Sequence, residues 1–136
     1  MNNTMTLIIG LILTFIILSI ARRIIFNIRS RGKFKNIKID DAISIYKNNK
    51  DIILIDVRSY SEVQQSGYIK NSINIALDDS KFEEKMSKLD KNKEYIVYCA
   101  SGSRSGMACL RMYKMGFKNI YNITHGGYFQ LSPHLN

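Results

Sequence analysis

The sequence predicts an α/β domain, with a mainly parallel sheet covered by helices on both faces, preceded by one transmembrane helix. From residue 37 onward, short apolar runs alternate with amphipathic segments, which is typical of parallel sheets covered by helices. Before residue 37 the chain holds a long uncharged apolar run. We therefore expect a short extracytoplasmic tail at 1–4, a transmembrane helix at 5–26, a basic juxtamembrane linker at 27–36 and one globular domain at 37–136.

The apolar run covers residues 5–21 and is apolar all round rather than on one stripe, which favours a membrane span over a surface helix. At ~1.5 Å per residue it is slightly shorter than a ~30 Å hydrocarbon core. Residues 24–26 can extend the helix while Arg22 and Arg23 snorkel. A cleaved signal peptide is the alternative, since residues 19–21 resemble a cleavage site, but the leader has no basic residue before its apolar core.

The net charge of +9 is unevenly distributed along the chain. Residues 37–136 carry 14 basic and 11 acidic side chains, a difference of +3, and the remaining +6 lies before residue 37 with no acidic side chain. Because Lys and Arg mark the cytoplasmic side of a span, we expect the N-terminus outside and the domain in the cytoplasm. The basic side chains of the flank, all after the apolar run, are Arg22, Arg23, Arg29, Arg31, Lys33 and Lys35.

Composition also narrows the functional classes. No basic stripe with interleaved aromatic residues occurs in the globular part, so nucleic-acid binding is not expected. Cys99 and Cys109, the two cysteines, cannot form a disulfide framework and are interpreted as free thiols in a reducing compartment.

The first half of the globular part contains two predicted strands and two predicted helices. Residues 37–39 form a short apolar strand, and Asp40 is expected to cap the amphipathic helix that follows. The continuous apolar run 52–57 predicts a strand buried on both faces. A short helix through 62–65 is expected to end at Gly67.

The second half repeats the alternation. A brief strand is predicted at 73–75, followed by a helix begun by a capping box of Ser80 and Glu83. A strand at 95–99 leads through a loop into a helix at 105–115, and residues 119–123 form the last strand. Ligands of such sheets bind beyond the carboxyl ends of the strands, which is where Cys99 lies.

The segment 99–105, Cys-Ala-Ser-Gly-Ser-Arg-Ser, carries the chemistry of the chain. It places a thiol beside the backbone amides of a small-residue loop and at a helix N-terminus, an environment that stabilises a thiolate. Gly102 permits the unusual backbone angles that such a cradle needs. Arg104 adds a forked set of donors suited to an oxyanion, and Ser101 and Ser103 supply hydroxyls at the rim.

Several motifs together resemble the single-domain rhodaneses, a family of sulfurtransferases. They are Asp56-Val57-Arg58 after a buried strand, Glu62, Gly67-Tyr68-Ile69, the segment 99–105, and Gly126-Gly127. The resemblance implies a rhodanese-like domain over 37–136. It also implies transfer of sulfane sulfur from a donor such as thiosulfate to a thiol or cyanide through a persulfide on Cys99. The expected donor-binding residues are Ala100, Ser101, Gly102, Ser103, Arg104 and Ser105.

Other polar residues are given structural roles or none. Asp56 and Arg58 are expected to form an ion pair that fixes the loop beside the site, and Cys109 is expected to pack in the core. His125 is assigned no chemistry, and no cluster has the spacing of metal ligands, so neither a metal nor a cofactor is expected. Family members often have Gly-His-Ile where this chain has Gly67-Tyr68-Ile69, and a tryptophan where it has Tyr128-Phe129.

Three alternatives remain open. The first is a persulfide carrier or sensor that exchanges sulfur with a partner protein without turnover of a small anion. The second is a regulatory binding domain, which the presence of both Cys99 and Arg104 makes less attractive. The third is a cysteine phosphatase or arsenate reductase, whose loops have five residues between cysteine and arginine, whereas four intervene here.

Overall fold

The computed structural model describes residues 2–136 and divides them into two compact units, one up to Arg31 and one from Gly32 to Asn136. The first unit is a single helix, α1 (Asn3–Ser30). The helix is long and apolar enough to cross a membrane, and its most apolar stretch is not buried. A signal sequence near the N-terminus meets the same criteria.

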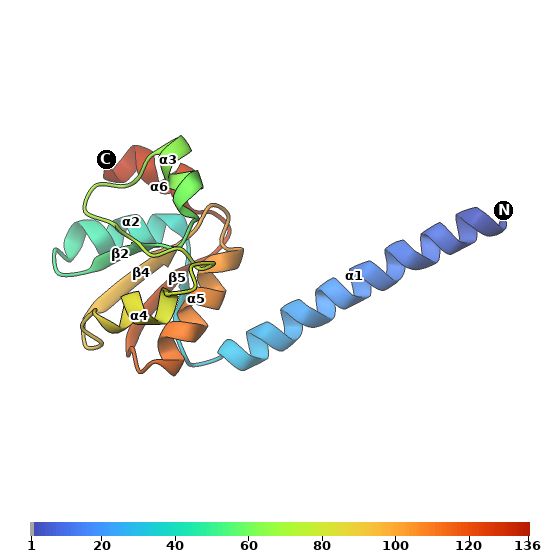
Figure 1. Ribbon diagram of the computed structural model, residues 1–136, viewed down its shortest axis with the longest axis horizontal. Coiled ribbons are helices and arrows are strands. Elements are labelled where there is room, and N and C mark those ends of the chain that lie inside the picture. The colour runs from blue at the N-terminus through green and yellow to red at the C-terminus, as the bar shows by residue number, and fades with distance from the viewer. Residues whose placement is uncertain (1) are drawn as a thin grey trace. The chain divides into compact units, whose positions relative to one another are not determined.

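The second unit is a five-stranded sheet with helices on both faces, as the sequence predicts (Figure 1). The strand order is β1-β5-β4-β2-β3, and every pairing is parallel. The strands are β1 (Lys35–Ile37), β2 (Ile53–Asp56), β3 (Ile73–Asn74), β4 (Glu94–Tyr98) and β5 (Asn119–Ile123). The helices of this unit are α2 (Ile39–Asn48), α3 (Tyr60–Ser66), α4 (Phe82–Ser87), α5 (Ser103–Lys114) and α6 (Tyr128–Leu135).

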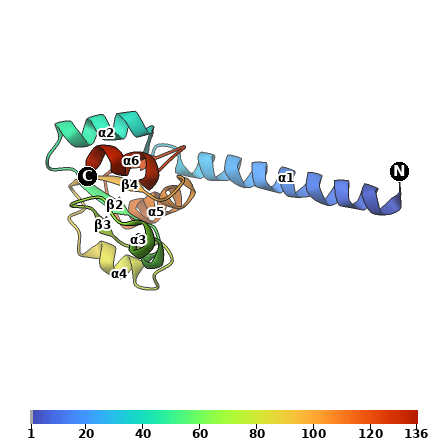
Figure 2. The same ribbon diagram turned by 90° about the horizontal axis from the view of Figure 1, so that it is seen from above.

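Each face of the sheet carries its own apolar core, because alternate residues of a strand point to opposite faces. On one face Ile55 and Val97 pack with side chains of α4 and α5, including Phe82 and Met112. On the other face Leu54 and Ile96 pack with side chains of α2 and α6, including Ala42 and Leu131. Figure 2 shows α2 and α6 together on one side of the strands and α4 on the other.

The boundaries of the first elements differ from the prediction. The first strand is Lys35–Ile37 rather than 37–39, because Lys35, Asn36 and Ile37 pair with Tyr121, Asn122 and Ile123 of β5. Helix α1 continues to Ser30, so the backbone between α1 and β1 is limited to residues 31–34.

Two predicted caps are wrong. Helix α2 begins at Ile39 after Lys38, so Asp40 lies in its first turn and does not cap it. Ser80 and Glu83 form no capping box, because α4 begins one residue later, after Lys81. The carboxylate of Asp79 accepts from the Lys81 amide at 2.8 Å and fixes that turn instead.

A capping box lies at the start of α3. The Ser59 hydroxyl accepts from the Glu62 amide at 3.3 Å, and the Ser59 amide donates to the Glu62 carboxylate at 2.9 Å. The helix ends at Gly67, as predicted, with the left-handed φ of 85° that favours glycine. This arrangement fixes the orientation of Glu62 next to the cysteine loop.

Candidate active site

Cys99 follows β4 directly, at the carboxyl end of a strand in the middle of the sheet. Its side chain is fully buried. Residues 100–102 form the loop after it, and α5 begins at Ser103, two residues earlier than predicted. Parallel strands place all their carboxyl ends at one edge of the sheet, so Cys99 shares that edge with Asp56, the last residue of β2.

The loop surrounds the sulfur with donors. The Gly102 amide donates to Sγ of Cys99 at 3.1 Å, and Oγ of Ser105 lies 3.8 Å from the same sulfur. Burial raises the pKa of the thiol, but the amides of Ser105, Ser101 and Gly102, together with the Ser105 hydroxyl, outweigh burial and lower the pKa overall. The arrangement therefore stabilises a thiolate, the nucleophilic form of cysteine.

Gly102 is needed for the shape of this loop. Its φ is 101°, in the left-handed region that side chains rarely adopt. A Cβ added there would lie 3.2 Å from the His125 amide nitrogen and 3.3 Å from the Ile123 carbonyl oxygen. The loop is thus packed closely against the end of β5, and glycine is required both for the backbone angle and for the space.

The segment after β5 closes the site from the other side. The Tyr128 amide donates to the Cys99 carbonyl at 2.9 Å, and a Cβ at Gly127 would overlap that same carbonyl oxygen. In the sequence, Gly126-Gly127 is one of the motifs of the resemblance and has no predicted contact. The close approach of two backbone segments is the reason for Gly127, and it becomes visible only once β4 and α6 are placed together.

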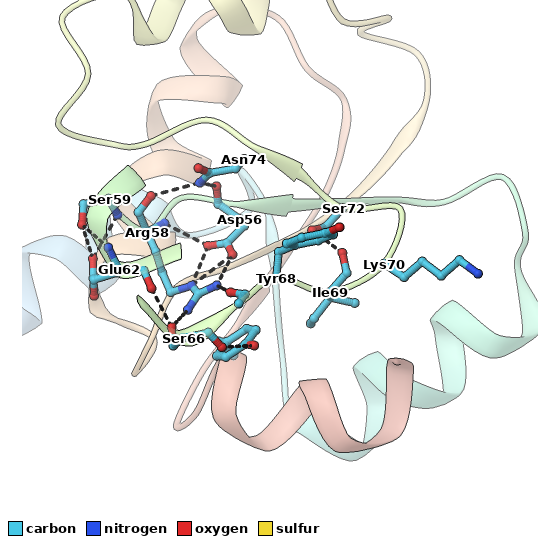
Figure 3. A network of polar contacts seen from close by, with 12 residues as sticks. Asp56, Arg58, Ser59, Glu62, Ser66, Tyr68, Ile69, Lys70, Ser72 and Asn74 are labelled. Carbon is cyan, nitrogen blue, oxygen red and sulfur yellow. Dashed lines mark hydrogen bonds and ion pairs between the residues drawn. The ribbon is translucent and has the colours of Figure 1, made fainter. Parts of the chain in front are cut away.

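Asp56 and Arg58 form the predicted ion pair, and both side chains are fully buried (Figure 3). Nη2 of Arg58 lies 2.7 Å from Oδ2 of Asp56, and Nε of Arg58 donates to both carboxylate oxygens at 3.0 Å. The other donors reach the Ser66 hydroxyl and the Gly67 carbonyl, each at 2.8 Å. Because burying two charges costs much of what their attraction returns, this pair fixes the geometry of the loop after β2 more than it adds stability.

The ring of Tyr128 covers this ion pair. The Arg58 guanidinium lies 3.7 Å from the ring centroid, and the Tyr128 hydroxyl donates to the Ser66 carbonyl at 2.6 Å. Tyr128 thus links the end of α3 to the carbonyl of Cys99 through one side chain and one backbone amide. An aromatic residue after the glycine pair therefore has a packing role here although it is not a tryptophan.

Arg104 points toward Glu62 of α3. Its Nη1 and Nη2 donate to the two carboxylate oxygens at 2.6 and 2.7 Å. The hydrogen bonds from Arg104 hold the pKa of the Glu62 carboxyl at about 2, against the opposing effect of burial, and Ser59 adds smaller contributions in the same direction. The sequence predicts that Arg104 binds the sulfur donor and predicts no role for Glu62. The Ser59-x-x-Glu62 spacing, which is typical of a capping box, indicates that the Glu62 side chain has a fixed orientation.

The remaining predicted residues lie around the same loop. Ser101 and Ser103 are exposed at its rim, and Ala100 is half-buried between them and Cys99. Cys109 is buried in α5, and burial raises its pKa well above the ordinary value, as suits a core thiol. His125 is exposed, with a left-handed φ of 57°. Within residues 2–136, no three His, Cys, Asp or Glu side chains gather as metal ligands.

Comparisons with known proteins agree with this site. A family model described as rhodanese-like domain matches residues 40–132. A putative sulfurtransferase of Bacillus subtilis, YtwF, is 40% identical over 78 residues, which cover 57% of this chain and 72% of that protein. The thiosulfate sulfurtransferase GlpE of Coxiella burnetii is 29% identical over 93 residues, covering 68% of this chain and 83% of that protein.

Among solved structures, the polysulfide-sulfur transferase homodimer of Wolinella succinogenes superposes with a TM-score of 0.63 at 27% identity. The match covers 82% of each chain. The sheet order, the cysteine loop and the family match all lead to one conclusion: this chain belongs to the rhodanese-like domain family and is a sulfurtransferase-like enzyme.

Proposed function

We propose that this protein transfers sulfane sulfur from an anionic donor such as thiosulfate to a thiol or cyanide, through a persulfide on Cys99, at the cytoplasmic face of a membrane. The observation that carries the proposal is the environment of the Cys99 sulfur. An amide donor lies 3.1 Å away and lowers the thiol pKa in spite of burial, so the loop favours the thiolate, which is the nucleophilic form.

In the first step the Cys99 thiolate attacks the outer sulfur of the donor. For thiosulfate, the bond between the two sulfurs breaks and sulfite leaves with the bonding electron pair, so that Cys99 carries a terminal persulfide anion. The amides that hold the thiolate can also hold this anion, because the N–H groups of Ser101, Gly102 and Ser105 already point toward the sulfur. No external oxidant or reductant is needed.

In the second step an acceptor thiolate or cyanide attacks the terminal sulfur. The persulfide bond breaks, and Cys99 is released as a thiolate stabilised by the same amides. Ser101 and Ser103 would contact the donor or acceptor at the exposed rim. Arg104 would orient an anionic donor with the N–H groups that its bonds to Glu62 leave open.

Mass spectrometry of the intact full-length protein after treatment with thiosulfate tests the chemistry. We expect a gain of one sulfur atom located on Cys99, no gain in Cys99→Ser, and an unchanged gain in Cys109→Ser. The Cys109→Ser variant is the matched control because both thiols are buried, but the pKa of Cys109 is raised whereas that of Cys99 is lowered. Sulfur found on Cys109 alone, or persulfide formation by Cys99→Ser, would refute the mechanism.

Helix α1 and the basic residues after it support the membrane location, with the N-terminus outside. A cysteine introduced at Asn2 in a Cys99→Ser and Cys109→Ser background should react with an impermeant maleimide on intact cells. The mass of the protein from the membrane fraction separates this topology from a cleaved leader, which would remove residues before Arg22. Reaction of a cysteine placed in the domain, with no reaction at position 2, would reverse the orientation.

A persulfide relay to a partner protein is the second candidate, and the state of Arg104 favours it. Both ends of the guanidinium are bound to Glu62, which leaves fewer donors for a small anion than an unpaired arginine would offer. A relay predicts persulfide on Cys99 in protein isolated from cells, together with slow conversion of thiosulfate and cyanide. Rapid turnover of thiosulfate by the purified protein would remove this candidate.

A further inference from the structure

A hollow of about 240 Å³ lies at the edge of the sheet where the strands begin, which we call the amino edge. It forms between the chain that enters β1 and the first residues of β5, which are neighbours in the sheet. Three lysines line it, and no acidic side chain does. Its lining residues are Gly32, Lys33, Phe34, Lys35 and residues 118–121.

The three lysines of this hollow, Lys33, Lys35 and Lys118, form no ion pair with any residue in the range 2–136. Lys33 and Lys35 rest near tyrosine rings, with Nζ 5.7 Å from the Tyr113 centroid and 5.8 Å from the Tyr121 centroid. These contacts place the two ammonium groups beside aromatic rings, which do not neutralise their charge. The site therefore presents positive charge that an external anion can neutralise.

Glu94 is an acidic side chain that is hydrogen-bonded to Tyr121, one of the residues that line the hollow, and both of its carboxylate oxygens have partners. Its Oε1 accepts from the Tyr121 hydroxyl at 3.3 Å and its Oε2 accepts from Asn49 at 2.6 Å. Lys91 adds a further cation, because the Lys118 amide donates to the Lys91 carbonyl at 3.3 Å and the Lys91 side chain lies over Gly116. The turn before β5 is thus basic as well.

Charge is divided between the two edges of the sheet. The loops that enter β2 and β4 at the amino edge carry Lys50, Lys91 and Lys93 against Asp51 and Asp90. At the carboxyl edge, where Cys99 lies, the first turns of α2 and α4 carry Asp40, Asp41, Glu83 and Glu84 against Lys38 and Lys81. The amino edge is the face of the domain that is suited to an anionic surface.

The chain that connects α1 to this edge is short. Residues 31–34 separate α1 from β1, and four residues span at most about 14 Å. If α1 spans a membrane, the hollow lies within reach of the headgroup layer, which is about 5–8 Å thick on each side of the hydrocarbon core. An anchored domain also meets lipid phosphates at a high effective concentration.

We propose that this hollow binds the phosphate of an anionic phospholipid, with Lys33, Lys35 and Lys118 around the headgroup oxygens. Phe34 and Ile120 supply an apolar lining that a glycerol backbone can contact and that a free phosphate ion does not need. Binding there turns the amino edge to the membrane and the Cys99 edge away from it, toward soluble donors and acceptors. The proposal rests on the membrane anchorage proposed above.

The test uses the full chain in nanodiscs made of phosphatidylcholine alone or mixed with phosphatidylglycerol, at one ionic strength. Lysine acetylation is followed by mass spectrometry. We expect Lys33, Lys35 and Lys118 to react about fivefold more slowly in the anionic discs, with Lys81 at the opposite edge unchanged. Inorganic phosphate added to the phosphatidylcholine discs should give no such protection, and equal protection by phosphate would assign the hollow to a free anion and refute the lipid.

Matched substitutions separate the hollow from general attraction of charge. Lys118→Gln, in the hollow, should abolish the protection of Lys35, whereas Lys93→Gln, at the same edge but outside the hollow, should leave it unchanged. An equal loss of Lys35 protection in both variants would show that protection depends on the overall charge of this edge and would refute a specific site in the hollow. Absence of the protein from the discs would refute the anchor and this proposal together. Stable insertion without lipid-dependent protection would refute this proposal alone, and the persulfide test on Cys99 is independent of both.

Discussion

The Arg104 guanidinium and the Glu62 carboxylate are joined by two hydrogen bonds, at 2.6 and 2.7 Å, between the cysteine loop and α3. Both side chains are about one-third exposed, so solvent weakens the attraction and the pair contributes little to stability. The pair matters because it determines the orientation of Arg104 beside the cysteine loop. Glu62 is fixed by its capping box and in turn determines where Arg104 points.

Glu62→Gln should strengthen the use of an anionic donor. The substitution removes a negative charge beside the cysteine loop and frees Arg104, so the KM for thiosulfate should fall about twofold to fivefold with little change in kcat. Steady-state kinetics of the purified protein measure this. Glu83→Gln is the matched control, because it breaks a similar exposed pair with Arg111 outside the site. A KM that stays constant or rises in Glu62→Gln would show that Arg104 does not act on the donor.

Acid should protonate the Glu62 carboxylate and so break its ion pair with Arg104. Because the folded pKa of Glu62 is about 2, below its ordinary value of 4.5, the stability that it contributes is present above pH 4.5 and is lost as pH falls toward 2. Urea unfolding of the wild type and of Glu62→Gln at several pH values measures this. We expect the difference between the two proteins to shrink over that interval. A constant difference from pH 6 to pH 2 would contradict the lowered pKa.

Cys99 should be alkylated by iodoacetamide with a pH midpoint below the ordinary value for a thiol. Ser105→Ala removes one of the groups that lower the pKa and should move the midpoint upward, and each pKa unit reduces the thiolate near neutral pH about tenfold. Ser103→Ala, at an exposed position that contributes no such effect, serves as the control. Cys109 should stay unmodified while the protein is folded. A midpoint that is the same in Ser105→Ala and the wild type would exclude this role of Ser105.

Much of the fold follows from local signals. The continuous run 52–57 predicts a strand buried on both faces, and β2 covers Ile53–Asp56 of it. Gly67 predicts the end of α3 because a helix often ends at a residue with left-handed φ, which glycine adopts readily. The misplaced caps have a different cause. Ser80-x-x-Glu83 matches the capping-box pattern as well as Ser59-x-x-Glu62 does. In the structure the Asp79 carboxylate instead accepts from the Lys81 amide and from the Lys85 side chain, and the pattern alone does not show this.

The sequence predicts the part of the site that one continuous segment forms. It does not predict the contacts between segments that are distant along the chain. Cys99, Gly102 and Ser105 lie within seven residues, and their chemistry can be inferred from helix N-terminus physics alone. The pairing of Arg104 with Glu62 spans 42 positions, and the contact of Gly127 with Cys99 depends on how α6 packs. Sequence patterns specify neither of these relationships, because neither has a fixed spacing.

Gly102→Ala should destabilise the domain more than Gly32→Ala does. Both glycines have positive φ, 101° and 75°, so each substitution carries a backbone cost of about 1–2 kcal/mol. A Cβ at Gly32 meets open space, whereas one at Gly102 is crowded by His125 and Ile123. Thermal unfolding compares the two variants. Equal shifts in Tm would mean that the cysteine loop can relax around the new methyl group.

Tyr128 offers a graded test of how the C-terminal helix supports the site. Tyr128→Phe removes only the hydroxyl that bonds to the Ser66 carbonyl, which should cost about 1 kcal/mol of unfolding free energy. Tyr128→Leu also removes the ring from the buried Arg58 guanidinium and should cost a further ~1–2 kcal/mol. Because the Tyr128 amide bonds to the Cys99 carbonyl, the leucine variant should also lower the rate of persulfide formation at temperatures where it remains folded. Tyr68→Leu, at an exposed position away from this ring, should change neither quantity. If Tyr128→Leu unfolds more readily but forms the persulfide at the wild-type rate, the ring supports the fold and not the position of the cysteine.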